Sequence, residues 1–256
     1  MRVEFLGTGT SQGIPVIGCS CPVCSSQDPR DDRLRSSVLV QACRRTLLID
    51  AGPDLRQQML RSGVQRLDAV LLTHEHMDHV GGIDELRSFN FLQGRAMDIH
   101  ANEATRSAVR TMYHYAFAEK RYPGVPQLEL KEVPDGLFRV HDVPVLPITV
   151  MHHFLPVLGF RIGGFAYVTD AKTIPEAELD KLRGAEVLVL NALRREEHIS
   201  HLNLSEALAL VRELRPVRAY FTHISHLLGT HAELEAELPE GVSLAHDGLV
   251  LELPEP

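Results

Sequence analysis

The chain has 256 residues, with 34 acidic and 26 basic side chains, a net charge of −8 at pH 7 and four cysteines. Because no basic block interrupts this charge, we expect neither an extended nucleic-acid partner nor a membrane partner. The first residues carry a single arginine and no long apolar segment, so neither a secretory signal nor a membrane span is expected, and a cytoplasmic protein is predicted. In a reducing compartment, cysteines are expected as metal ligands or buried thiols rather than disulfides.

No linker, repeat or low-complexity tract divides the chain, so one domain over residues 1–256 is predicted. Short β-prone runs alternate with helical patterns in both halves, which indicates an α/β (α+β) chain with two sheets covered by helices. A helical stretch from Asn102 to Tyr122 carries an apolar stripe. This stripe would belong to the core, cover a pocket or join a second subunit, so a homodimer is one of the alternatives. The clearest helix follows Asn203, where Glu206 completes a capping-box pattern, and ends before Pro216.

Three thiols lie close together near the beginning of the chain, at Cys19, Cys21 and Cys24. The i,i+2 pair is too cramped for an easy disulfide, and three thiolates require a fourth tetrahedral ligand. His226 can provide that ligand. We therefore predict a tetrahedral metal site that organises a small loop at residues 18–26.

Four β-prone apolar runs each end at a potential metal ligand, so four strand ends can converge on one site. The runs and their final residues are Thr46–Ile49 before Asp50, Ala69–Leu72 before His74, Phe165–Val168 before Asp170, and Ala219–Phe221 before His223.

The second of these runs leads into HEHMDH, residues 74–79. In a regular helix His74 and His76 would point about 200° apart, so a helix cannot direct both at one ion. The H-E-x-x-H protease signature is also excluded, because Asp78 stands where its second histidine would be. In an extended segment His74, His76 and Asp78 share one side, and a turn then brings His79 round. Four ligands this close predict two metal ions, with His74 and His76 on one and Asp78 and His79 on the other.

Other local signals are weaker. GTGTSQG, residues 7–13, is neither a dinucleotide fingerprint nor a phosphate-binding loop, and a tight turn near the metals is expected there. Cys43 is expected in the core. Isolated histidines, among them His198, are expected at solvated loop positions. The arginines expected as solvated loop charges are Arg30, Arg33 and Arg35, whereas Arg194 and Arg195 are candidates for phosphate binding.

The segment THEHMDH resembles the H-x-H-x-D-H motif of the metallo-β-lactamase fold hydrolases, and further motifs of that family follow in order across nearly the whole chain. The resemblance implies a four-layer αββα sandwich. It also implies that Asp50, in LLIDAG, orients a ligand histidine from behind the metals. Asp170, in FAYVTDAK, would bridge both ions, and His223, in AYFTHISH, would bind the second ion.

The segment MHHFLPVLGF resembles the one that supplies a third histidine to the first ion in this family. We choose His153, because in the phosphodiesterase branch this histidine precedes a Gly-aromatic pair by six residues, and Gly159 with Phe160 fits that spacing. His152 is the alternative.

The cysteine cluster with His226 resembles the PhnP group of phosphoribosyl 1,2-cyclic phosphate phosphodiesterases, whose structural zinc has this ligand type. ISHLNLSEAL resembles the segment in which a histidine, here His201, protonates the leaving group. The resemblance implies a metal-dependent phosphoric diester hydrolase with two catalytic ions of manganese, zinc or iron. Its implied substrate is a small phosphodiester, specifically a cyclic sugar phosphate. Asp78 would also hold the nucleophile.

Three other functions are weighed against this one. A tRNA 3′ processing endonuclease of the same fold would need an extended basic arm, which we do not find in the sequence. A thioester or lactam hydrolase would have no need of the cysteine cluster and His201. A non-catalytic, zinc-stabilised binding module would leave the second set of ligands, Asp78, His79 and Asp170, without a purpose.

Overall fold

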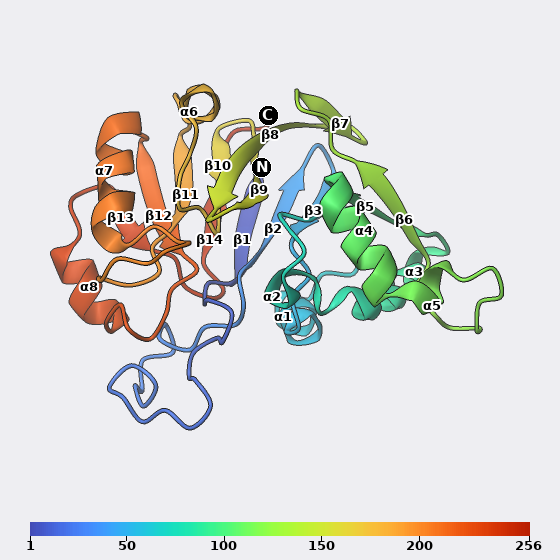
Figure 1. Cartoon of the computed structure of the whole chain (residues 1–256), viewed down its shortest axis with the longest axis horizontal. Helices are drawn as coiled ribbons and strands as arrows, with labels where there is room; N and C mark the ends of the chain where they lie inside the picture. Colours follow the sequence, from blue (N-terminus) through green and yellow to red (C-terminus); the bar gives the residue numbers. More distant parts are fainter.

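The strands of the chain pair into two mixed, seven-stranded sheets that pack face to face (Figure 1). A computed structural model describes all residues, 1–256. The first sheet has the order β14 (Val250–Glu252), β1 (Arg2–Gly7), β2 (Ser37–Ala42), β3 (Arg45–Ile49), β4 (Ala69–Leu71), β5 (Met97–Ala101) and β6 (Leu128–Glu132). The second has the order β13 (Val242–Leu244), β12 (Arg218–Thr222), β11 (Val187–Asn191), β10 (Phe165–Tyr167), β9 (Leu155–Ile162), β8 (Val143–His152) and β7 (Phe138–Val140).

Helices cover the outer face of each sheet, as Figure 1 shows. The first sheet is covered by α1 (Leu55–Ser62), α2 (Met77–Val80), the 3₁₀ helix η1 (Ile83–Leu86), α3 (Arg87–Gln93), α4 (Glu103–Met112) and α5 (His114–Phe117). The second is covered by α6 (Glu176–Leu182), α7 (Leu204–Leu214) and α8 (His231–Glu237). The predicted α/β chain with an αββα sandwich is therefore confirmed. None of the helices is long and apolar enough to cross a membrane.

The alternation of side chains along each strand explains the layers. In β3, Leu47 and Ile49 enter the core between the two sheets, whereas Leu48 faces the helices. In β11, Val187 and Val189 share the same central core, and Leu188 faces α6 and α7. Because both sheets contribute to this central core, it supports the prediction of one domain over the whole chain.

Two predicted helices have different outcomes. At α7 both halves of the capping box are present, between Asn203 and Glu206, and the helix ends at Leu214, with Arg215 as its C-cap before Pro216. The helix expected from Asn102 to Tyr122 is shorter, because the backbone leaves the helical conformation at Tyr113 and a second short helix ends at Phe117. Of its apolar stripe, Val109, Tyr113 and Ala116 pack against the first sheet, which favours the core interpretation. A homodimer stays a prediction.

Candidate active site and metal centres

The four predicted strand ends meet at one edge of the sandwich. β3 and β4 are parallel neighbours in the first sheet, and β10, β11 and β12 are parallel in the second. Parallel strands bring their carboxyl ends to the same edge of a sheet. The residues that follow β4, β10 and β12 therefore face one another across the gap between the sheets.

The first half of the resulting cluster consists of three imidazoles. His74 follows β4, and His76 is the extended N-cap residue of α2, as expected for an extended HEH segment. His74 Nε2 lies 3.0 Å from His76 Nδ1, and the ring of His152, at the end of β8, lies 5.3 Å from the His76 ring. His152 Nδ1 donates to the carbonyl of Ser200 at 2.8 Å, so its Nε2 lone pair is free for a cation.

The second half contains Asp78, His79 and His223, with Asp170 between the two halves. His79 Nε2 lies 3.1 Å from Asp78 Oδ2 and 3.4 Å from Asp170 Oδ1. His223 Nδ1 lies 3.2 Å from the same Asp170 oxygen. The other oxygen, Oδ2, faces the first half, 3.8 Å from His74 Nε2. Asp170 therefore directs one carboxylate oxygen into each half, which is the arrangement that a bridging ligand requires.

Asp50 supports this centre from behind. Its Oδ2 accepts a hydrogen bond from His79 Nδ1 at 2.7 Å and another from the Thr73 hydroxyl at 2.9 Å. Thr73 Oγ1 donates its hydrogen to Asp50, so the same oxygen accepts a hydrogen bond from His74 Nδ1 at 3.0 Å. The Nε2 atoms of both histidines are left as acceptors. Hydrogen bonds of this kind orient the ligands of a metal site.

The residues fit a cation on chemical grounds. His79 Nε2 is completely buried and has no hydrogen-bond partner, because the nearby carboxylates lie off the hydrogen-bonding direction. A buried nitrogen without a partner is costly, and a metal ion would satisfy it. Imidazole and carboxylate donors accept manganese, zinc and iron alike. His74, His76 and His152 would hold one ion together with Asp170. The other ion would be held by Asp78, His79 and His223, again with Asp170.

Electrostatics also favour bound cations here. Burial lowers the pKa of His79, but the carboxylates of Asp170, Asp50 and Asp78 outweigh burial and raise it well above its ordinary value. Burial raises the pKa of Asp170, yet His223 and His79 bring it well below its usual range, so this group stays a carboxylate. A pocket in which three carboxylates surround one imidazole attracts positive charge.

Three residues of the site adopt a left-handed backbone directly after their strands: Asp50 (φ 64°), Asp170 (φ 56°) and His223 (φ 55°). Residues other than glycine rarely adopt this conformation, which recurs at functional sites. The sharp turn ends the strand and directs the side chain toward the edge of the sheet.

The third histidine of the first half is His152, and the choice of His153 for this position is corrected. β8 and β9 form a hairpin in which His152 pairs with Leu155, so His153 and Phe154 make up a two-residue turn. His153 has a φ of 56°, is exposed, and packs its ring 3.7 Å from the Phe154 ring. The structure therefore places His152 in the cluster and His153 outside it.

His201 lies at the rim of the cluster. Its Nε2 is 3.2 Å from Asp170 Oδ2, and its ring lies 4.4 Å from the His152 ring and 5.0 Å from the His223 ring. The side chain is 11% exposed, so it has access to both the centre and an incoming molecule. His198 was expected to be a solvated loop residue, but it contacts His201 through its Nδ1 atom.

The cysteine cluster forms a second, separate centre. His226 Nδ1 lies 3.3, 3.4 and 3.5 Å from the sulfurs of Cys19, Cys21 and Cys24, respectively. Zinc bonds of about 2.3 Å to sulfur and 2.0 Å to nitrogen in a tetrahedron separate the two atoms by roughly 3.5 Å, so the geometry fits zinc. The Cys24 N–H and His226 lower the pKa of Cys21 to about 6, which favours the thiolate. In Figure 1 the loop lies on the side of α8, beyond the sheets.

The arginines considered as phosphate ligands are engaged elsewhere. Arg195 Nη2 donates to both carboxylate oxygens of Glu237 at 2.8 Å, and Arg194 donates to the backbone carbonyls of Glu196 and Glu197. Arg33, expected to be solvated, is 2% exposed and binds Thr8, so that expectation is wrong.

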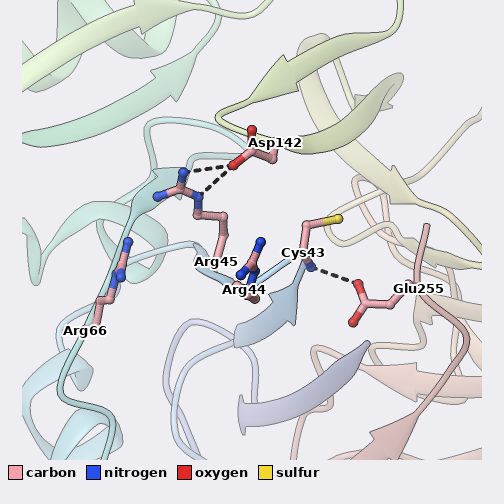
Figure 2. A pocket seen from close by; sticks show the side chains of 6 residues that line it. All are labelled: Cys43, Arg44, Arg45, Arg66, Asp142 and Glu255. Carbon is pink, nitrogen blue, oxygen red and sulfur yellow. Dashed lines mark hydrogen bonds and ion pairs between the residues drawn. The ribbon is translucent and has the colours of Figure 1, made fainter.

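A surface pocket of about 670 Å³ lies at the opposite end of β3 from Asp50, and Figure 2 shows its lining. Arg45 binds Asp142 there, at 2.8 and 3.2 Å, and the Cys43 N–H donates to Glu255 at 2.8 Å. Cys43 is in the β2–β3 turn and only partly packs against the central core. The pocket contains none of the predicted site residues.

The family follows from comparison with known proteins. Residues 45–224 match the β-lactamase superfamily domain. The chain belongs to the β-lactamase superfamily. It is 40% identical to a diphosphatase of the PhnP family whose crystal structure superimposes with a TM-score of 0.92, covering 99% of this chain and 98% of that one. The predicted likeness to the PhnP group is confirmed, and so is the prediction of an enzyme, a hydrolase of this fold rather than a non-catalytic module.

Two further relatives extend the likeness. An octanoyltransferase of Porphyromonas gingivalis is 42% identical over 252 residues; the match covers 97% of this chain, which spans only about half (51%) of that protein's length. The zinc-bound PqqB of Methylobacterium extorquens has a TM-score of 0.80 at 22% identity, over 99% of this chain and 100% of that one, and shows the same fold.

Proposed function

We propose that the protein is a binuclear, metal-dependent phosphodiesterase that hydrolyses a small phosphodiester. The observation that carries this proposal is the position of Asp170, which directs one oxygen into each half of the cluster and contacts His201 Nε2 at 3.2 Å. The likeness to a protein described as a diphosphatase of the PhnP family supports hydrolysis at phosphorus.

Two divalent ions, when bound, would lower the pKa of a shared water and neutralise the phosphoryl oxygens. The chain supplies the remaining chemistry. Asp78, 13% exposed at its side chain, can accept a hydrogen bond from the attacking water while it ligates. His201 can donate the proton on Nε2 to the departing oxygen, because this atom faces the centre from the rim.

The charge distribution favours a small substrate over a polynucleotide. The net charge is −8, and Arg33, Arg194 and Arg195 each bind groups of the protein itself, so these three arginines are not free to hold a nucleic-acid backbone. A five-membered cyclic sugar phosphate such as phosphoribosyl 1,2-cyclic phosphate is the substrate that we propose within this class.

A substrate panel tests the proposal. The manganese-loaded and zinc-loaded enzymes would be assayed with a ribose 1,2-cyclic phosphate, a diphosphate diester and a tRNA precursor. We expect turnover of the cyclic phosphate, with His201→Ala lowering kcat about 10²- to 10⁴-fold while the metal content is retained. Cleavage of the tRNA precursor alone would favour the endonuclease alternative. Turnover of the diphosphate diester alone would keep the phosphoryl hydrolase but replace our choice of substrate.

A further inference from the structure

The turn that leads into α7 places His198 next to the proton donor His201. His201 Nδ1, the nitrogen that faces away from the cluster, lies 3.2 Å from His198 Nδ1 and 3.1 Å from Ser200 Oγ. Ser200 Oγ is also 3.2 Å from His198 Nδ1. These three polar atoms therefore form a closed triangle behind the proton donor.

The backbone decides where the hydrogens are. The Ser200 N–H donates to His198 Nδ1 at 3.3 Å. A backbone amide can only donate, so His198 Nδ1 presents its lone pair to this triangle. His201 Nδ1 lies 3.2 Å from this lone pair, a distance at which it can donate, and we assign the hydrogen between the two nitrogens to His201 Nδ1.

The same turn also orients a predicted metal ligand. The Ser200 carbonyl accepts the hydrogen on His152 Nδ1 at 2.8 Å, and the His152 and His201 rings lie 4.4 Å apart, edge to face. Burial, His201 and Arg194 lower the pKa of His198, so this residue is neutral and able to accept at neutral pH. The turn from His198 to His201 thus orients both the proton donor and a ligand of the first half.

We infer that His198 is a positioning residue for His201: it accepts the hydrogen on Nδ1, fixes the ring, and thereby reserves the Nε2 proton for the leaving group. This inference rests on the proposed phosphodiesterase function. In the step concerned, the oxygen of the attacking water forms a bond to phosphorus, the bond from phosphorus to the leaving oxygen breaks, and the electron pair of the broken bond stays on the leaving oxygen. The oxygen takes the proton from His201 Nε2, and the ring keeps its hydrogen on Nδ1 until water returns a proton to Nε2.

Leaving-group dependence separates this role from a merely structural one. A phenolate such as p-nitrophenolate departs without a proton, whereas an alkoxide needs one. We would compare bis(p-nitrophenyl) phosphate with a five-membered cyclic ribose phosphate, whose opening releases an alkoxide. The variants are His198→Ala, His198→Phe, which retains ring volume without an acceptor, and His198→Gln, whose amide oxygen can accept. Ile199→Ala, at a neighbouring side chain that is 68% exposed, is the matched control.

We expect His198→Ala and His198→Phe to lower kcat on the cyclic phosphate about 10- to 100-fold, the usual effect of losing such a supporting hydrogen bond. On bis(p-nitrophenyl) phosphate kcat should stay within about threefold, metal content should be unchanged, and His198→Gln should restore most of the loss. Equal losses on both substrates, or no loss on either, would overturn the positioning role. A wild-type enzyme that hydrolyses neither substrate would overturn the proposed function, and this inference with it.

Discussion

The catalytic cluster and the cysteine cluster are both predicted metal sites, but the protein builds them differently. In the catalytic cluster His74, Asp170 and His223 are at most 2% exposed and stand just beyond strand ends, and the buried His79 lies in α2. The other members, His76, Asp78 and His152, are half-buried or exposed. All four residues of the cysteine cluster are partly exposed, and Cys19, Cys21 and Cys24 lie in a loop without regular secondary structure.

The support behind the ligands differs in the same way. Asp50 holds His79, Thr73 holds His74, and the Ser200 carbonyl holds His152. By contrast, the polar contacts of the three thiols are with His226 and with neighbouring amides, and Cys21 and Cys24 also pack against the core of the second sheet. We infer that the sheets preorganise the catalytic centre, whereas the loop, which has no regular secondary structure, would gain more of its rigidity from a bound ion. The following substitutions test this difference, beginning with the one that should have the largest effect.

Asp170→Asn should abolish the link between the two halves of the catalytic cluster. Without the negative charge, both ions lose a shared ligand, and we expect kcat to fall at least about 10³-fold, or about 4 kcal/mol of activation free energy. Metal analysis should show loss of catalytic ions with the zinc of the cysteine loop retained. Full activity with two catalytic ions still bound would show that Asp170 is not a bridge.

His152→Ala and His153→Ala form a matched pair of neighbours. Only His152 faces the cluster, so its loss should lower kcat about 100-fold, or about 2.7 kcal/mol, and reduce the catalytic metal content. His153→Ala should leave kcat within about twofold, because its side chain is exposed in the hairpin turn. Steady-state kinetics with metal analysis would check both, and the reverse order would restore the original choice of His153.

Asp50→Asn should weaken the support without removing a ligand. The amide retains an oxygen for His79 and Thr73 but loses its charge, and we expect the affinity for the ion in the second half to fall about 10-fold. Titration of the metal-free protein with manganese would measure this. An unchanged affinity would mean that His79 is held by its surroundings alone.

Cys21→Ser should affect stability more than chemistry. We expect one zinc ion fewer per chain, a melting temperature lower by about 5 °C, and kcat within about fivefold of the wild type. Metal analysis, thermal unfolding and kinetics would establish the three values. A loss of activity as large as that of Asp170→Asn would contradict the division into a preorganised and a metal-dependent region.

Much of this architecture is predictable because local signals in the sequence agree with the fold. The runs before Asp50, His74, Asp170 and His223 are short, β-prone and apolar, so their ends identified the residues that the structure brings together. The alternation within HEHMDH likewise required an extended segment followed by a turn.

The predictions from sequence fail where the backbone conformation does not depend on recognisable residue types. The hairpin turn at His153 and Phe154 contains no glycine or asparagine, so nothing in the sequence marked where β8 ends. The contact between His198 and His201 depends on one tight turn. The left-handed backbone at Asp50, Asp170 and His223 is imposed by the surrounding sheets, and the sequence carries no signal for it.

The central claim is that two cations lie on either side of Asp170. Anomalous diffraction from crystals of the manganese-loaded protein tests it most directly. We predict two manganese peaks roughly 3.5–4 Å apart, one beside His74, His76 and His152 and the other beside Asp78, His79 and His223. A single peak, or peaks that Asp170 does not touch, would contradict the account.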